Sequence, residues 1–184
     1  SSDICRTLTL KYHQTHQVIK GLKTYLFKLD PSNFQNFLEN PINSGFGTKL
    51  APLNLKNLNN SFEPGIYPSG IFDISRCKFG APFFISQPHF LNADPYYLTM
   101  LDGLNPNYSL HDFWIENEPI TGANLLGQAK IQLNVGIYKP NFGRFKNIPS
   151  IIFPVFWQNY SFSIESEIEK NLRHLNFIVY ALPN

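Results

Sequence analysis

The chain has 184 residues, of which 43% are hydrophobic and 15% aromatic, so it can bury a core and intrinsic disorder is excluded as its default state. Its 15 basic and 13 acidic residues give a net charge of +2, and the lysines are scattered, which excludes the basic stripe that nucleic-acid binding requires. No apolar run approaches the roughly 18 residues needed to span a bilayer.

The first 74 residues predict a β-hairpin followed by an irregular excursion. Apolar and polar residues alternate over 6–12 and again over 22–29, which is the period-two pattern of strands, with a turn at Lys20-Gly21 in a long loop. Breakers recur from Asp30 to Ser69, so we expect an irregular surface segment there. A short strand is predicted at 70–74.

The segment from Cys77 to Gly122 is dense in proline and in apolar clusters. Its five prolines forbid a long helix, because proline lacks a backbone donor and restricts the residue before it. Phe83-Phe84-Ile85 and Phe113-Trp114-Ile115 are too apolar for a solvated linker. We therefore expect a packed segment whose direction is set by fixed turns, such as the one at Asp102-Gly103.

Residues 123–138 carry the clearest pattern in the chain. Apolar residues alternate with polar ones, so one face is apolar (Ile131, Leu133, Val135, Ile137) and the other polar (Lys130, Gln132, Asn134, Gly136). This pattern predicts a half-buried antiparallel strand.

The C-terminal region predicts a loop at 140–149 and then a strand at 151–157, in which Pro154 indicates an edge or a bulge. Ile164, Ile168, Leu172 and Leu175 recur at helical spacing and predict a helix over 163–175. The apolar residues 177–182 predict either a closing strand or the approach to a segment beyond Asn184.

Two cysteines and three glycosylation sequons bear on the compartment. Cys5 and Cys77 are either two buried thiols or one disulfide of an oxidising compartment. The sequons at Asn59, Asn107 and Asn159 favour an extracytoplasmic location.

No residue pattern indicates catalysis, a cofactor or a metal. His13 and His16 form a close pair, but they lack a third ligand at metal-site spacing. We expect His89 to bond to backbone in a turn and His111-Asp112 to cap the entry to a strand. No nucleophile stands beside a base, so we predict that the protein is not an enzyme. The aromatic residues of 72–114 form either core or the wall of an apolar cavity.

Several motifs occur together in a fixed order: SDICR at 2–6, GIFDISRCK at 70–78, GAP at 80–82, PHF at 88–90, DGLNPN at 102–107, His111, EPITG at 118–122 and IFPV at 152–155. With the strand at 125–138 and the sequon at Asn159, they resemble the class B scavenger receptor family. That family includes the lysosomal integral membrane protein and the insect sensory neuron membrane proteins. The resemblance covers nearly the whole chain.

The resemblance implies that residues 1–184 are the C-terminal part of a single ectodomain, without its two membrane helices and its N-terminal half. The implied fold is mainly β with short helices, as part of an antiparallel β-barrel with an apolar tunnel. The implied function is a membrane scavenger receptor that binds and transfers lipids, namely fatty acids, sterol esters or lipoprotein lipid. The alternative is a receptor for a protein cargo, of the lysosomal type.

The resemblance also implies a location and particular residues. The protein would reside in the plasma membrane or the lysosome, with this segment extracellular or luminal. Cys5 and Cys77 correspond to cysteines that pair in relatives, and Lys78 to a proposed contact with a fatty-acid carboxylate. Some relatives have further cysteines in the loop that here contains Gly45 and Gly47, which implies that those bridges are absent and the 30–69 loop looser.

Overall fold

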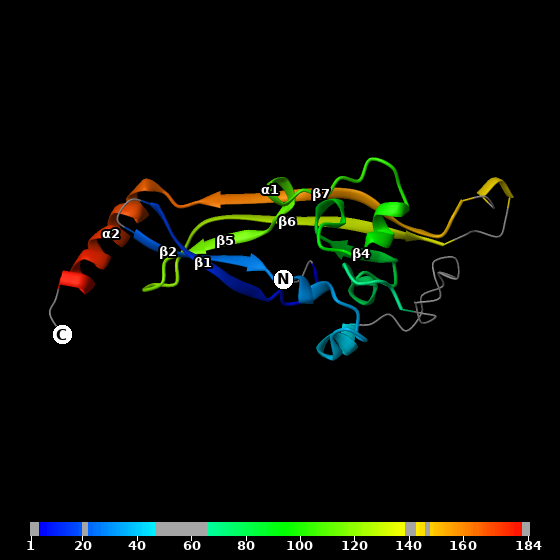
Figure 1. The fold of residues 1–184 in the computed structure, drawn as a ribbon, viewed down its shortest axis with the longest axis horizontal. Coiled ribbons are helices and arrows are strands. Elements are labelled where there is room, and N and C mark those ends of the chain that lie inside the picture. The colour runs from blue at the N-terminus through cyan, green and yellow to red at the C-terminus, as the bar shows by residue number, and fades with distance from the viewer. Residues whose placement is uncertain (1–3, 20–21, 47–65, 139–142, 146–147, 182–184) are drawn as a thin grey trace. The chain divides into compact units, whose positions relative to one another are not determined.

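The structure, a computed structural model, describes residues 4–19, 22–46, 66–138, 143–145 and 148–181. They form a mainly antiparallel β-fold with short helices, which confirms the predicted fold class (Figure 1). The strands are β1 (Leu10–Ile19), β2 (Leu22–Leu29), β3 (Ile71–Asp73), β4 (Phe83–Ser86), β5 (Trp114–Asn117), β6 (Asn124–Ile137) and β7 (Ile151–Ser163). The helices are α1 (Tyr108–His111) and α2 (Ser166–Ala181), with 3-10 helices at Pro31–Phe34, Pro41–Phe46, Ser75–Cys77, Pro88–Phe90, Pro95–Thr99 and Gly143–Phe145.

The chain forms two compact units. The first contains Ser1–Leu8, Pro31–Asp112 and Lys130–Gln158, and the second contains Thr9–Asp30, Phe113–Ala129 and Asn159–Asn184. Strands β6 and β7 pair with each other and contribute residues to both units. Among the predicted features, the turn at Lys20-Gly21 and residues 140–142 and 146–147 of the 140–149 loop lie outside the described residues.

In the second unit, β1, β2, β5 and the start of β6 pair in that order. The predicted hairpin is confirmed, and β2 matches its prediction at both ends. The predicted bounds of the first strand and the long loop are wrong, because β1 begins at Leu10 and continues through His13 and His16 to Ile19. Residues 11–15 are exposed, so this part of β1 is defined by its hydrogen bonds to β2 and not by burial. The alternation over 6–12 therefore coincides only with the first residues of the strand.

The turn between β5 and β6 is built by the EPITG motif at 118–122. The Glu118 carboxylate accepts hydrogen bonds from the Ile120 N–H (2.9 Å), the Thr121 N–H (2.6 Å) and the Thr121 hydroxyl (2.7 Å). Gly122, with a φ of +72°, donates its N–H to the Glu118 carbonyl (2.9 Å). Burial alone would raise the pKa of Glu118, but these hydrogen bonds outweigh it and lower the pKa.

Helix α2 supplies the core of the second unit. Leu172 packs with Leu22 and Leu125, all three of them buried. The predicted helix is confirmed, but the predicted strand at 177–182 is wrong, because α2 continues to Ala181. Phe177, Ile178 and Val179 are exposed on this last part of the helix. Such β-branched and aromatic residues favour strands by propensity, which the continuing helix overrides.

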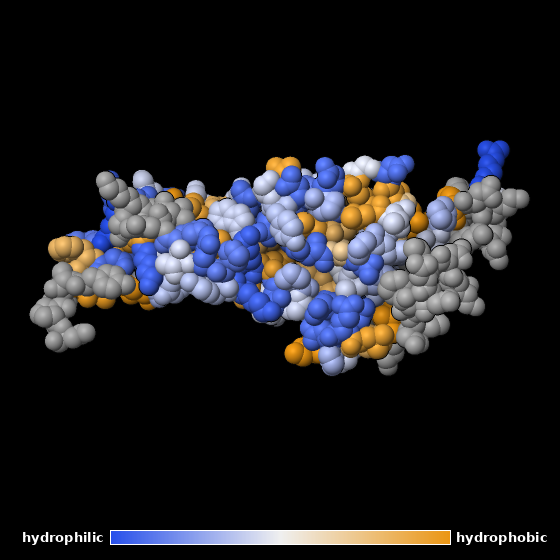
Figure 2. Space-filling view, viewed as in Figure 1, coloured by the Kyte–Doolittle hydropathy of each residue, from blue (hydrophilic) through white to orange (hydrophobic). Residues whose placement is uncertain are grey.

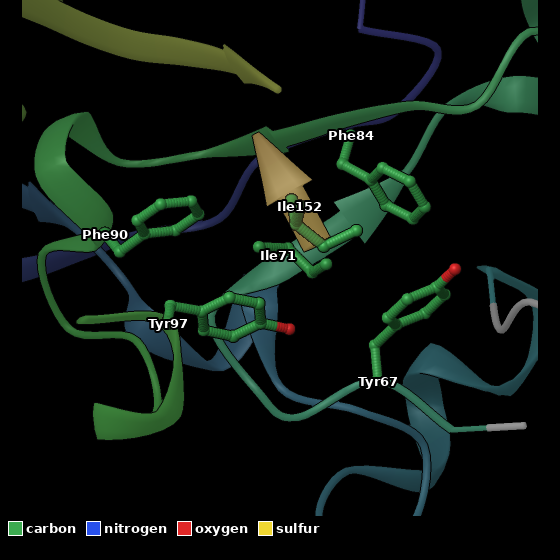
Figure 3. Close-up of a cluster of buried hydrophobic side chains, with 6 residues drawn as sticks. All are labelled: Tyr67, Ile71, Phe84, Phe90, Tyr97 and Ile152. Carbon is green, nitrogen blue, oxygen red and sulfur yellow. The ribbon is translucent and has the colours of Figure 1, made fainter. Parts of the chain in front are cut away.

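In the first unit, β4 lies between β3 and the C-terminal part of β6. One core cluster consists of Tyr67, Ile71, Phe84, Phe90, Tyr97 and Ile152, all buried (Figure 3). The rings of Phe90 and Tyr97 stack with centroids 5.0 Å apart, and the Tyr97 hydroxyl donates to the Pro68 carbonyl (2.7 Å). These aromatic residues of 72–114 are therefore core, which is one of the two alternatives given by the sequence.

The face of β6 that is buried differs between the start and the end of the strand. Leu125 and Gly127, in the second unit, are buried at odd-numbered positions. In the first unit the buried positions are even-numbered: Lys130, Gln132, Asn134 and Gly136. Two consecutive half-buried residues, Gln128 and Ala129, separate the two patterns.

Gly70 marks a close approach of two backbone segments in the first unit. Its φ is +119°, and a Cβ atom placed on it would lie 2.0 Å from the Ala93 Cβ and 2.4 Å from the Ala93 Cα. Neither atom belongs to a flexible side-chain end that could move away. Only glycine fits this position.

We predict that Gly70→Ala lowers the free energy of unfolding by about 3 kcal/mol or more, because overpacking adds to backbone strain. Gly103→Ala is the matched control: Gly103 also has a positive φ, +89°, but a Cβ there meets no atom within 4 Å. It should cost only about 1–2 kcal/mol. Denaturant unfolding of the full-length protein measures both, and equal losses would contradict the close contact.

Candidate functional site

The apolar and polar faces of β6 in the first unit are the central feature of the candidate site. Its partner β4 places Ile85 opposite Leu133 and Phe83 opposite Val135, so these side chains share the apolar face. On this face Ile131, Leu133, Val135 and Ile137 are all only half-buried. The strand and the positions of its faces are as predicted.

The polar face of β6 is the buried one. Gln132 is 2% exposed and Asn134 0%, and both contact Ser86 of β4, which is also 0% exposed. The Gln132 Nε2 donates to Asn134 Oδ1 (2.8 Å), and the Asn134 Nδ2 donates to Ser86 Oγ (3.0 Å). Mutual hydrogen bonding is the condition under which polar side chains can be buried. Sequence alternation defines two faces but cannot tell which one is covered.

The segment that follows β4 is fixed to this polar network. The His89 N–H donates to the Gln132 Oε1 (2.8 Å), and the Lys130 ammonium donates to the Leu110 carbonyl (2.7 Å). Lys130 is only 5% exposed. The hydrogen bonds therefore hold the 86–111 segment against the polar face.

Strand β7 adds further apolar surface to the first unit. Ile152 is fully buried, whereas Phe153, Val155, Phe156 and Trp157 are 40–55% exposed. The predicted strand is confirmed but runs on to Ser163, beyond the predicted end at Trp157. In the space-filling view, apolar side chains reach the surface among predominantly hydrophilic ones (Figure 2).

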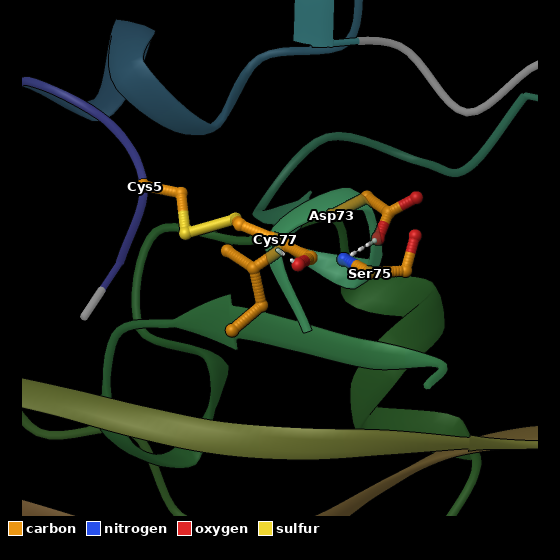
Figure 4. Close-up of a disulfide and its surroundings, with 5 residues drawn as sticks. Cys5, Asp73, Ser75 and Cys77 are labelled. Carbon is orange, nitrogen blue, oxygen red and sulfur yellow. Dashed lines mark hydrogen bonds between the residues drawn. A yellow bond between two sulfur atoms is a disulfide. The ribbon is translucent and has the colours of Figure 1, made fainter. Parts of the chain in front are cut away.

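The N-terminal segment is attached to the 3-10 helix Ser75–Cys77, which follows β3, by a disulfide between Cys5 and Cys77, whose Cα atoms are 6.4 Å apart (Figure 4). Before Cys77, the Asp73 Oδ1 accepts the Ser75 N–H (2.7 Å) and the Ile74 carbonyl accepts the Cys77 N–H (3.1 Å). The pairing implied by the resemblance is thus present. Its sequence separation of 72 residues corresponds to a stabilisation of roughly 4 kcal/mol in the chain-entropy model.

Lys78 immediately follows this disulfide. It is half-buried and ends the 3-10 helix Ser75–Cys77, with its N–H donating to the Ser75 carbonyl (3.0 Å).

A small pocket lies beside the N-terminal segment. It measures about 40 Å³, and Arg6, Asn43, Tyr67 and Phe72 are among the residues that line it. The Arg6 guanidinium lies over the Phe72 ring, 5.3 Å from its centroid, and donates to Asn43 Oδ1, while burial lowers the pKa of Arg6. Pockets for drug-sized ligands begin at roughly 300 Å³, so this one is too small for a lipid chain.

Three histidines, His16, His89 and His111, have hydrogen-bond partners in the structure. His16 Nδ1 lies 2.5 Å from the Glu116 Oε1, on β1 and β5 of the second unit. His89 and His111 each accept a backbone N–H, as expected for His89, and His111 ends α1 rather than capping a strand. Within the described ranges, no group of three or more His, Cys, Asp or Glu side chains could hold a metal ion.

Two of the three sequons can be placed. Asn107 is exposed and caps α1, its Oδ1 accepting from the Ser109 N–H (2.9 Å) and hydroxyl (2.7 Å). Asn159 is exposed on β7. Asn59 and Gly47 lie outside the described residues. No helix in the part of the chain that the structure describes is long and apolar enough to cross a membrane.

Two known proteins are similar in sequence to most of this chain. Scavenger receptor class B member 1 from Mus musculus is 33% identical over 158 residues, which are 85% of this chain and 28% of the receptor. Sensory neuron membrane protein 1 from Helicoverpa assulta is 31% identical over 179 residues, covering 97% of this chain and 31% of that protein. The chain thus spans about three tenths of the length of these relatives.

The match to a known protein family extends over nearly the whole length of the chain. The sequence model of the CD36 family matches residues 1–183. This match and the relatives named scavenger receptor class B member 1 confirm the resemblance found in the sequence. The chain belongs to the CD36 family.

Proposed function

We propose that the chain is part of a membrane receptor that binds lipids and transfers them along an apolar conduit. The fitting ligands are fatty acids, sterol esters and lipoprotein lipid. The names of the relatives, scavenger receptor and sensory neuron membrane protein, support a receptor in the membrane. The observation that carries the lipid proposal is the inverted burial of β6, with its polar face covered and its apolar face half-open.

The inversion matters because a two-faced strand ordinarily buries its apolar side. Here Gln132, Asn134 and Ser86 satisfy one another, so their face is closed by hydrogen bonds. The apolar side chains of the same strand are only half-buried, so they retain surface that another apolar group can contact: Ile131, Leu133, Val135 and Ile137. Acyl chains and sterol rings gain free energy from such contact in proportion to the apolar area that they remove from water.

The surrounding features fit a receptor ectodomain. The Cys5–Cys77 disulfide is of the kind that persists in oxidising compartments, which supports an extracellular or luminal position at the plasma membrane or the lysosome. We propose that the chain is the C-terminal part of one such ectodomain, anchored by segments outside it, and that it has no enzymatic activity or cofactor.

Recognition of a protein cargo is the second candidate. The exposed apolar residues of β7, such as Phe156 and Trp157, favour it, because exposed apolar patches also mark protein interfaces. Pull-down of protein ligands by the full-length ectodomain, with and without competing lipid, separates the two. Cargo capture that lipid does not reduce, together with no saturable lipid binding, would favour the cargo receptor.

We predict that the double variant Ile131→Thr and Ile137→Thr weakens binding of a fluorescent fatty acid to the full-length ectodomain by roughly tenfold, because each hydroxyl replaces apolar contact. Threonine retains the β-branched shape that suits a strand. Ile42→Thr is the matched control, since Ile42 is 85% exposed on the 3-10 helix Pro41–Phe46. Unchanged affinity in the double variant would contradict a lipid contact on this face.

Lys78→Ala is expected to weaken binding of a fatty acid by about three- to tenfold, through loss of a charge-assisted contact with the carboxylate. Binding of the methyl ester of the same acid should not change, because the ester carries no charge. Lys170→Ala, on the exposed side of α2, serves as the control. Fluorescence titration with both ligands measures the effect, and an equal loss for acid and ester would rule out a carboxylate contact.

For the sequons, Ser109→Ala and Ser161→Ala should each remove one N-glycan without disturbing the fold. Alanine at 109 still supplies the N–H that the Asn107 side chain accepts, so the cap of α1 is retained. Enzymatic deglycosylation followed by gel electrophoresis of protein from a secretory host counts the glycans. A variant that migrates as the unaltered protein does would show that its sequon is unoccupied.

A further inference from the structure

His89 and His111 form a stacked pair in the first unit. Their ring centroids are 4.4 Å apart and the ring planes differ by 5°. His89 belongs to the 3-10 helix Pro88–Phe90, and His111 is the last residue of α1 and only 5% exposed. The Trp157 ring of β7 contacts His111 in a T-shaped arrangement, with the two ring centroids 5.7 Å apart.

Both rings accept hydrogen bonds from the same short loop. The Asn105 N–H donates to His89 Nδ1 (3.2 Å), and the Asn107 N–H donates to His111 Nδ1 (3.1 Å). A histidine nitrogen can accept only when it carries no proton. Both rings must therefore be neutral, with their proton on Nε2, for the loop to be held as it is.

The charges around the pair oppose its protonation. From β6, the buried Lys130 ammonium faces His111, and His89 faces it from the neighbouring 3-10 helix. Trp157 of β7 carries no ionisable group, and Asp112 follows His111 in the chain. Burial, His89 and Lys130 together lower the pKa of His111 below its ordinary value. Two stacked imidazolium rings beside an ammonium would repel one another.

The backbone has positive φ values at His89 and at two residues close after it. His89, Phe90 and Asn92 have φ values of +52°, +56° and +60°, in the left-handed region that is uncommon for residues other than glycine. The bond from the His89 N–H to Gln132 fixes this conformation on one side, and the stack with His111 holds it on the other.

We propose that His89 and His111 are an acid-sensitive latch that holds the loop 105–111 closed while both rings are neutral and releases it when they are protonated. This inference is independent of the proposed function. The contribution of His111 to this stabilisation is complete above its ordinary pKa of 6.5 and is lost as the pH falls through the lowered pKa of His111 in the folded protein. Release loosens the loop that precedes α1, while the Lys130 bond to the Leu110 carbonyl still holds the end of this helix.

Hydrogen–deuterium exchange of the full-length protein at about pH 7.5 and about pH 5 tests the latch, after correction for the intrinsic pH dependence of exchange. We expect exchange of the Asn105 and Asn107 amides to rise by roughly tenfold at the lower pH, as the loss of one or two hydrogen bonds requires. The rise should follow the titration of the two histidines, observed by NMR. Unchanged protection at a pH at which NMR shows both rings protonated would overturn the proposal without any variant.

The double variant His89→Asn and His111→Asn separates titration from structure. The asparagine Oδ1 can accept the loop amides in place of Nδ1 but does not titrate, and asparagine tolerates the positive φ at position 89. This variant should keep the loop protected at both pH values. His174→Asn, on the exposed side of α2, should behave as the unaltered protein does. An acid-dependent rise that persists in the double variant would also overturn the proposal.

Discussion

The arrangement of the first unit depends on the hydrogen bonds that bury the polar face of β6. Gln132 and Asn134 share their donors and acceptors with Ser86, and Gln132 also accepts the His89 N–H. Removing one partner would leave a buried polar group unsatisfied, at a cost of about 1–3 kcal/mol. The network therefore couples the sheet to the 86–111 segment and determines which face of the strand stays open.

The sequence predicts those elements in which apolar residues recur at the period of the strand or helix that they form. The alternation of 123–138 and of 22–29 predicts β6 and β2, and the spacing of Ile164 to Leu175 predicts α2. It fails where pairing with a neighbouring strand, or the continuation of a helix, sets the structure instead. β1 is held by pairing with β2 although its residues 11–15 are exposed, and 177–181 is helical because α2 continues past Leu175.

The candidate site could be predicted only in part for the same reason. The pairing of Cys5 with Cys77 is implied only by motifs shared with relatives, because a separation of 72 residues gives no local signal of pairing. The sequence shows that β6 has two faces, but the covered face depends on whether Gln132 and Asn134 find partners elsewhere in the chain. The stacking of His89 on His111 likewise joins residues from separate turns, and no periodicity encodes it.

The change of burial phase within β6 has a consequence for insertions and deletions. Adding or removing one residue between Gly127 and Lys130 would turn every later side chain of the strand to the opposite face. The side chains of Ile131 and Leu133 would then point at the 86–111 segment, and the amides of the next residues would lose their partners. A change of two residues keeps every side chain on its own face. Length variation at this point should therefore be accepted in steps of two.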